Sequence, residues 1–230
     1  MEVWFSKFIN LVGASVCHQL PERSFHAGSL AIPVCARCEG IYIGFFISAV
    51  FLFLMFRRRE SDLPRVYIVV ILCLFIISTV IDGGLSYLGL VKTNNILRYL
   101  TGFLSGTGSM AIAYPVFNFQ YYRQPGYVRV FNRTWQFVVF LAVNAVFIFA
   151  GLAGNRVVNL VFYFVAFISV IFTFYFINLV ILVLIPFFAK KASNLFSRYL
   201  VLPSIISLAL TFAELYLSYR FHLFILRFSF

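Results

Sequence analysis

Three cysteines and two histidines near the N-terminus form the part of the sequence best suited to chemistry. Residues 17–44 read CHQLPERSFHAGSLAIPVCARCEGIYIG and contain Cys17, Cys35, Cys38, His18 and His26. The Cys-x-x-Cys spacing of Cys35 and Cys38 can place two thiolates around one metal ion. A third thiolate and an imidazole then complete the tetrahedral set that zinc prefers. The sequence therefore predicts a zinc site formed by these cysteines and a histidine, either His18 or His26.

The same cysteines also suit two other roles. In an oxidising compartment Cys35 and Cys38 can form a disulfide, which the Cys17 thiolate would then attack. Alternatively, a structural zinc ion fastens the N-terminal loop to the rest of the chain. Cys73 lies within a run of Leu, Ile and Val and is interpreted as a packing residue.

The composition is that of a membrane protein. Of the 230 residues, 63% are hydrophobic and 11% are charged, whereas a soluble domain has roughly 45–50% apolar and about 25% charged residues. We therefore expect an all-α polytopic transmembrane bundle that forms a single domain and contacts membrane lipids. The basic residues behind the net charge of +11 lie in short loops between apolar runs. That pattern indicates orientation in a membrane, so no nucleic-acid partner is expected.

Long apolar runs predict six membrane spans, because one span needs about 20 apolar residues. They are Val34–Phe56, Val66–Val91, Ile96–Phe119, Trp135–Gly151, Val157–Phe188 and Tyr199–Tyr219. Residues 1–39 are interpreted as an N-terminal interfacial helix followed by the Cys/His loop. Residues 40–220 form the predicted six-helix bundle, and residues 221–230 an interfacial tail.

The positions of the basic residues predict the orientation of these spans. Three alternate loops, Arg57–Arg65, Arg123–Arg133 and Lys190–Arg198, are rich in arginine and lysine. Basic loops face the cytoplasm in most membrane proteins. We therefore expect a multi-pass protein of the cytoplasmic (inner) membrane, with both termini and the cysteine segment facing outward.

Charged residues of several spans would then gather at the outward end. Asp82 lies near the end of the second span, Arg98 near the start of the third and Glu214 near the end of the sixth. A charge in the hydrocarbon region costs roughly 2.5–3.5 kcal/mol on insertion scales, so it is usually paired and functional. We expect Asp82 to pair with Arg98 across the short connection between these spans, or to act as a general base.

The cysteine segment, residues 17–44, resembles the hallmark of a family of bacterial and archaeal membrane proteins, domain of unknown function 2085. Its pattern is CHQxPxRSFxxGxxxPxCxRCxGxYxG, and a second match, DG…NxxRxxTGxxxG, extends from Asp82 to Gly106. The residues that the resemblance assigns to a shared site are Cys17, His18, Gln19, Arg23, Ser24, Cys35, Arg37, Cys38, Tyr42, Asp82, Asn95 and Arg98. His26 is absent from the pattern, which favours His18 as the fourth metal ligand. The resemblance implies no particular activity.

Together these residues predict a metal-dependent membrane enzyme that acts on a lipid or lipid-linked head group. Zinc would activate water or polarise a carbonyl or phosphoryl oxygen. Asp82 would serve as the general base, and Arg23 and Arg98, with Arg37, would hold an anionic group. One alternative is a thiol–disulfide oxidoreductase linked to a quinone or to a partner's cysteines. Another is a transporter or binding protein for an anionic substrate with a structural zinc. The oligomeric state stays open.

Overall fold

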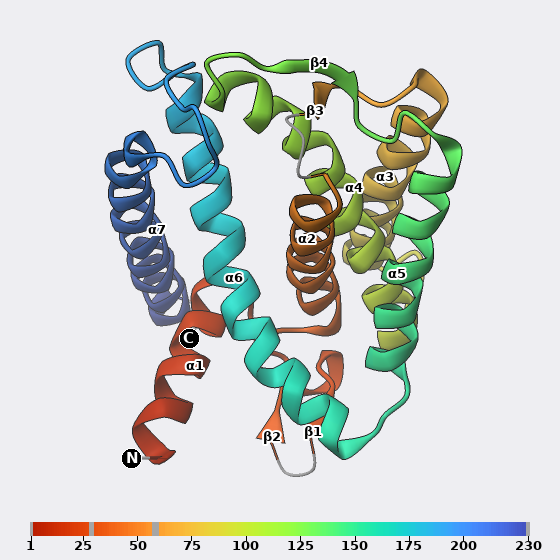
Figure 1. Ribbon diagram of the computed structural model, residues 1–230. Coiled ribbons are helices and arrows are strands. Elements are labelled where there is room, and N and C mark those ends of the chain that lie inside the picture. Colours follow the sequence, from red (N-terminus) through yellow and green to blue (C-terminus); the bar gives the residue numbers. More distant parts are fainter. Residues whose placement is uncertain (1, 28–29, 57–59, 229–230) are drawn as a thin grey trace.

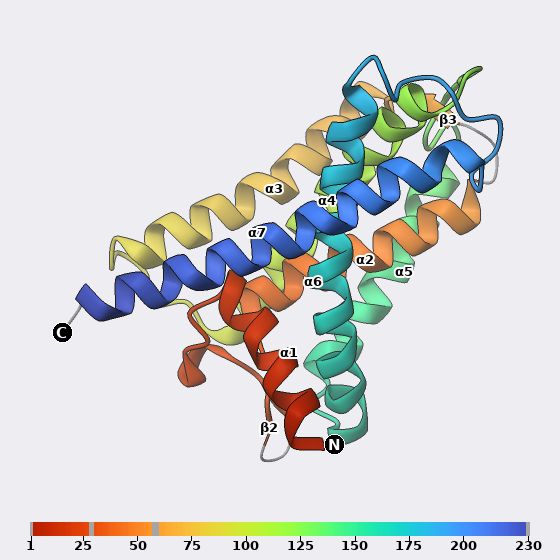
Figure 2. The same cartoon turned by 90° about the vertical axis from the view of Figure 1, so that its left-hand side faces the viewer.

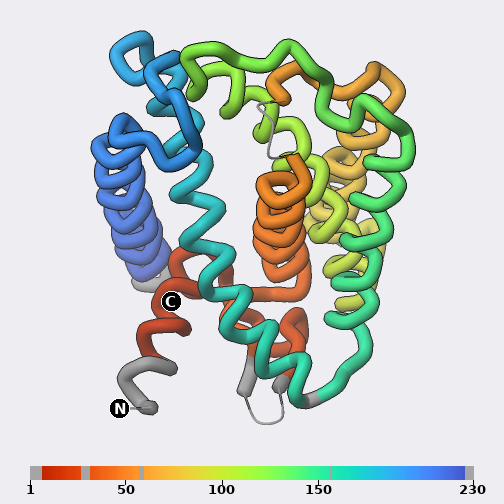
Figure 3. Tube along the Cα trace, in the orientation of Figure 1, coloured from red at the N-terminus to blue at the C-terminus, as the bar shows by residue number. Residues whose placement is uncertain are grey.

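The computed structural model describes residues 2–27, 30–56 and 60–228, and its long helices run up and down between two ends of the molecule (Figure 1, Figure 3). The helices are α1 (Glu2–Val16), α2 (Ala36–Met55), α3 (Val66–Tyr87), α4 (Asn95–Tyr121), α5 (Thr134–Leu152), α6 (Arg156–Leu184) and α7 (Val201–Phe228). This architecture confirms the predicted all-α polytopic bundle, and each of the six predicted spans corresponds to one long helix.

Five segments among the described residues are long and apolar enough to cross a membrane, and they contain α2, α3, α5, most of α6 and most of α7. Helix α4 occupies the position of the third predicted span and has 27 residues. At 1.5 Å per residue that length is about 40 Å, more than the roughly 30 Å of a hydrocarbon core. Its composition is less apolar because most of its surface is buried against other helices, where glycine, serine and threonine fit.

Helices α2 and α4 pack with their backbones in contact, at the centre of the bundle (Figure 1). Gly40 and Gly44 on α2 face α4, and Gly102 and Gly106 on α4 face α2. A Cβ atom at Gly40 would collide with the backbone carbonyl of Tyr99, and one at Gly106 with that of Ile41. Two small-xxx-small motifs therefore pack against each other, which allows a close approach of helices in membranes.

The remaining helices surround this pair. Helix α3 packs on α4, α6 packs on α2, and α7 packs on α6 and on α1 (Figure 2). Much of the surface of α3 and α7 exposes large apolar side chains, such as Val70 and Leu74 on α3 and Leu210 and Phe212 on α7. These surfaces suit contact with lipid tails.

The basic loops meet at one end of the bundle. Strand β3 (Glu60–Asp62) pairs in parallel with β4 (Gly126–Arg129), and the Lys190 amide donates a 2.6 Å hydrogen bond to the Gln120 carbonyl oxygen. All three predicted basic loops therefore share one end, although Arg57, Arg58 and Arg59 lie outside the described residues. Which side of the membrane this end faces stays a prediction.

The cysteine segment lies at the opposite end. It contains a short 3-10 helix η1 (Pro21–Arg23) and a hairpin of β1 (His26–Ala27) and β2 (Leu30–Ala31). A further 3-10 helix, η2 (Arg198–Leu200), precedes α7 at the basic end. Helix α7 continues to Phe228 and so includes residues 221–228 of the predicted tail. The interfacial location of that tail and of α1 stays a prediction.

The α2–α4 contact predicts the effect of adding one methyl group. Gly106→Ala places a Cβ against the Ile41 carbonyl and should lower the free energy of unfolding by about 1–3 kcal/mol, the usual cost of overpacking. The measurement is the melting temperature in detergent. Gly84→Ala is the matched control on α3, because its Cβ would meet nothing within 4 Å. Equal melting temperatures for both variants and the wild type would contradict the close packing.

Candidate metal centre

Three cysteine thiols converge at the end of α1 and the start of α2. The Sγ atoms of Cys17, Cys35 and Cys38 all lie within 4.8 Å of one another. Thiolates bound to one tetrahedral zinc at about 2.3 Å would lie roughly 3.8 Å apart. Small rotations of these half-buried side chains therefore suffice to hold one ion. The predicted cysteine cluster is thus present as a group of free thiols that could bind a metal.

The N-terminus of α2 favours the anionic form of this cluster. Cys35 is the N-cap residue of α2, and its backbone N–H donates a 3.1 Å hydrogen bond to the Cys17 Sγ atom. Cys38 lies in the first turn of the same helix, so its thiol is also near the positive end of the helix dipole. One thiolate shared among three sulfur atoms is a suitable starting point for metal binding, because the thiolate is the ligand form.

Gln19 brings Cys17 to the other two cysteines. Its Nε2 atom donates hydrogen bonds to the carbonyl oxygens of Asn10 (2.9 Å) and Pro33 (2.7 Å). Its backbone has a φ of 50°, in the left-handed region, so the chain turns sharply directly after α1. Gly13 has no side chain where α1 crosses the Pro33 carbonyl, and a Cβ there would collide with it. These contacts fasten α1 to the segment that precedes Cys35.

Neither predicted histidine belongs to the cluster among the residues that the structure describes. The ring of His18 instead packs edge-to-face against His222 of α7, with centroids 5.4 Å apart. His26 is exposed in β1, and its carbonyl oxygen accepts a 3.0 Å hydrogen bond from Asn159 Nδ2. The fourth ligand stays a prediction. His222 was missed from the sequence, where its only signal is being the one histidine outside the cysteine segment.

Asp82 pairs with Arg37 rather than with Arg98, so the expected partner was wrong. Arg37 Nε donates a 2.8 Å hydrogen bond to Asp82 Oδ2, and Arg37 Nη2 donates to the same oxygen. Arg98 instead donates to Thr93 Oγ1 (3.0 Å) and Asn95 Oδ1 (3.4 Å). The reason is the close packing of α2 against α4. It brings Arg37, which lies between Cys35 and Cys38, to the buried Asp82 side chain on α3.

This pairing changes the expected role of Asp82. Its carboxylate is buried, and Thr101 Oγ1 lies 3.4 Å from the oxygen that Arg37 contacts. Its Oδ2 atom already accepts two hydrogen bonds from the Arg37 guanidinium. The geometry therefore supports a positioning role, in which Asp82 holds the Cys-x-x-Cys turn onto α3. A general-base role stays a prediction.

The other predicted site residues lie around the same end. Arg23 is exposed at the end of η1, and the half-buried Arg98 lies in the first turn of α4. Asn95 Nδ2 donates a 3.1 Å hydrogen bond to the Glu22 carbonyl oxygen and so joins η1 to the start of α4. Three arginines therefore share the end of the bundle that holds the thiols.

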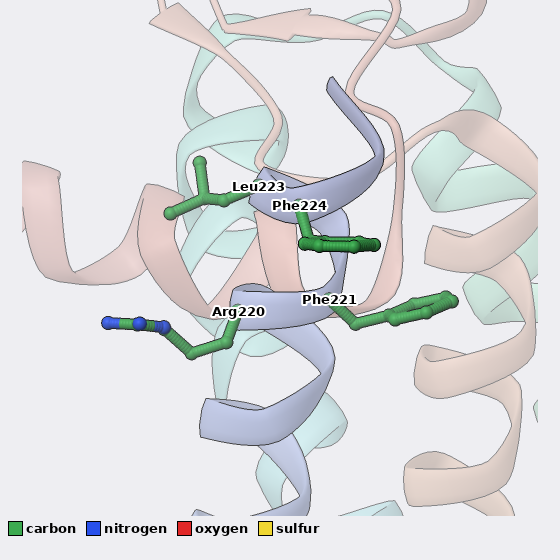
Figure 4. Close-up of a pocket in the computed structure, with 4 residues that line it drawn as sticks. All are labelled: Arg220, Phe221, Leu223 and Phe224. Atoms are coloured by element: carbon green, nitrogen blue, oxygen red, sulfur yellow. The ribbon is translucent and has the colours of Figure 1, made fainter. Parts of the chain in front are cut away.

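Two pockets open near the end of α7. One, of about 210 Å³, is lined by Ala14, Ser15, Val16, Cys17, His18, Ser218, Phe221, His222 and Ile225. The other is lined by Arg220, Phe221, Leu223 and Phe224, whose side chains leave α7 on two different sides (Figure 4). The described residues of this second pocket all come from one helix, so it is a surface groove. The first pocket reaches Cys17 of the cysteine cluster.

The ion pair predicts a coupling between two side chains. Asp82→Asn and Arg37→Gln should each lower the free energy of unfolding by about 1–3 kcal/mol, because each leaves a partly buried polar partner unpaired. The double variant should recover about 1 kcal/mol or more of the summed loss. Combining Asp82→Asn with Arg98→Gln is the control and should give additive losses. Coupling of Asp82 to Arg98 and not to Arg37, measured by melting in detergent, would refute the pairing.

Sequence comparison matches the part of the chain that holds the cysteine cluster to a known family. The family described as Predicted membrane protein (DUF2085) matches residues 17–112, which contain all three cysteines of the cluster, Arg37, Asp82 and Arg98. No solved structure matches the chain.

Two archaeal relatives, both bearing only the description of an uncharacterized protein, match about half of the chain. The protein of Methanocaldococcus jannaschii is 32% identical over 117 residues, which cover 49% of this chain and 73% of the relative. The protein of Methanothermobacter thermautotrophicus is 38% identical over 93 residues, which cover 40% of this chain and 79% of the relative. Because most of each relative is covered at these identities and the family's own segment spans the cysteine cluster, this chain belongs to the family of predicted membrane proteins known as DUF2085.

Proposed function

We propose that this membrane protein binds one zinc ion through Cys17, Cys35 and Cys38 and acts as a metal-dependent enzyme on a lipid or lipid-linked head group. The observation that carries the proposal is the approach of three Sγ atoms to within 4.8 Å of one another. Three protein ligands leave the fourth position of a tetrahedral zinc free for water or a substrate oxygen, as in catalytic sites. An ion bound there would supply Lewis-acid chemistry.

The arginines indicate the class of substrate. Guanidinium groups bind phosphate and carboxylate oxygens through paired, charged hydrogen bonds. Arg37 is engaged with the Asp82 carboxylate. Arg23 is exposed, and Arg98 bonds to the neutral side chains of Thr93 and Asn95. These two guanidinium groups are therefore the ones proposed to bind an anionic group. The exposed apolar surfaces of α3 and α7 extend away from this end. A ligand with an anionic head and apolar tails could therefore place its head near the arginines and its tails along these apolar surfaces.

We further propose that the site faces outward from the cytoplasmic membrane. The support is the grouping of the basic loops at the opposite end of the bundle, where the positive-inside rule places the cytoplasm. Outside the cytoplasm, free thiols this close would tend to form a disulfide unless a metal ion held them. The same proximity therefore supports a thiol–disulfide oxidoreductase as the second candidate, and metal content separates the two.

The zinc proposal predicts the metal content of the purified protein. The wild type should contain about one zinc per chain by elemental analysis, and Cys35→Ser should lose most of it because a hydroxyl is a poor zinc ligand. Cys73→Ser is the matched control, since that thiol is exposed on α3 and outside the cluster. A metal-free wild type with a disulfide between two cluster cysteines, found by mass spectrometry, would instead support the redox candidate.

The substrate proposal predicts selective lipid binding. Native mass spectrometry of the detergent-solubilised protein should show phosphatidylglycerol retained more than phosphatidylcholine. Arg98→Gln should reduce that preference several-fold, since it removes one guanidinium from the cysteine end. Arg129→Gln, at an exposed position of β4 at the other end, is the control and should have little effect. An equal loss in both variants would indicate non-specific attraction of anionic lipid and count against a binding site at the cysteines.

A further inference from the structure

We propose that His18 and His222 form a second, exchangeable site for a divalent transition-metal ion such as zinc. The site is the pocket of about 210 Å³ between the end of α1 and α7. His18 is exposed and His222 is half-buried, and both line this pocket. His222 is not among the described residues of the cysteine cluster, and it lies outside the segment that matches the family.

A hydrogen bond between the two helices sets the histidines opposite each other. The Ser218 hydroxyl on α7 donates to the Ser15 carbonyl oxygen on α1. His222 follows Ser218 by four residues, one helical turn, and so lies on the same face of α7. His18 follows Ser15 by three residues, just past the end of α1. The contact that joins the helices therefore also brings the two imidazoles together.

The separation of the rings suits a shared ion. Imidazole nitrogen is a common ligand for zinc, copper and nickel. Two imidazoles on one tetrahedral zinc, with Zn–N of about 2.0–2.1 Å, would have centroids roughly 5 Å apart. The observed centroids are 5.4 Å apart with an interplanar angle of 79°. Rotation of the rings, with little movement of the helices, would direct one nitrogen of each toward the same ion.

The position of the pocket suggests what the ion does there. Cys17 lines the pocket and also belongs to the cysteine cluster. Two imidazoles with water in the remaining positions hold zinc less tightly than three thiolates, so an ion here can exchange with solution and move to Cys17. This delivery role rests on the proposed function, whereas metal binding by the histidines does not.

The first test removes the cluster and keeps the histidines. Calorimetric titration of the Cys35→Ser/Cys38→Ser protein with Zn²⁺ should show one site, and adding His222→Ala should weaken it at least tenfold. His26→Ala is the matched control, because His26 is exposed in β1 and does not line the pocket. Cu²⁺ bound to the same protein should show coupling to two nitrogens by electron paramagnetic resonance. Binding that is indifferent to His222→Ala, or coupling to fewer than two nitrogens, would overturn the proposal.

The second test uses the intact cluster, so it also serves if the double variant does not fold. Zinc-loaded wild type should bind a further equivalent of Cu²⁺ through two nitrogens, and His222→Ala should lose that equivalent while keeping its tightly bound zinc. Loss of the tight zinc in His222→Ala would make His222 a ligand of the cluster and reject a second site. A wild type without tight zinc that still shows the histidine-dependent Cu²⁺ would reject the proposed function and retain this inference.

Discussion

The close contact of α2 with α4 is the constraint on which the rest of the structure depends. Four glycines lack the Cβ atoms that would collide with the facing backbone, so the two helices approach closely. This brings the first turn of α2, with Cys35, Arg37 and Cys38, beside the first turns of α4. It also lets the Arg37 side chain reach past α4 to Asp82 on α3. Larger residues at the glycines would separate the helices and move the metal-binding turn away from both partners.

The N-terminal loop completes the site through apolar contacts of Phe25, Ile32 and Val34 and through several hydrogen bonds. Gln19 bonds to carbonyl oxygens of Asn10 and Pro33, Asn95 bonds to the Glu22 carbonyl, and the Cys35 amide bonds to the Cys17 sulfur. Ordering a loop costs roughly 1–2 kcal/mol of backbone entropy per residue, and a few hydrogen bonds offset only part of that. A metal ion shared by Cys17, Cys35 and Cys38 would connect the loop to α2 and stabilise it further.

Features set by local pattern could be predicted from the sequence, and features set by helix packing could not. The spans follow from hydropathy, and the cysteine cluster follows from one short spacing and one further cysteine. The partner of Asp82 depends instead on how α2 and α3 each pack against α4, and the glycines of α2 and α4 set the first of these contacts. Helix α7 runs past its predicted end because no glycine or proline follows Pro203. The basic and aromatic residues after Tyr219 do not by themselves end a helix. The contact between His18 and His222 joins residues about 200 positions apart in the chain, so no local sequence pattern predicts it.

The residues of the two candidate sites are divided between the segment that matches the family and the rest of the chain. The segment that matches the family ends at residue 112, within α4. It contains the cluster cysteines, the Arg37–Asp82 pair and the four glycines, so the site and the packing that positions it form one unit. Helices α5 to α7 lie outside that segment. They cover the unit and, through Ser218 and His222, add one wall of the pocket beside Cys17. All three thiols therefore lie in the segment that matches the family, whereas Ser218 and His222, which line the pocket beside Cys17, lie outside it.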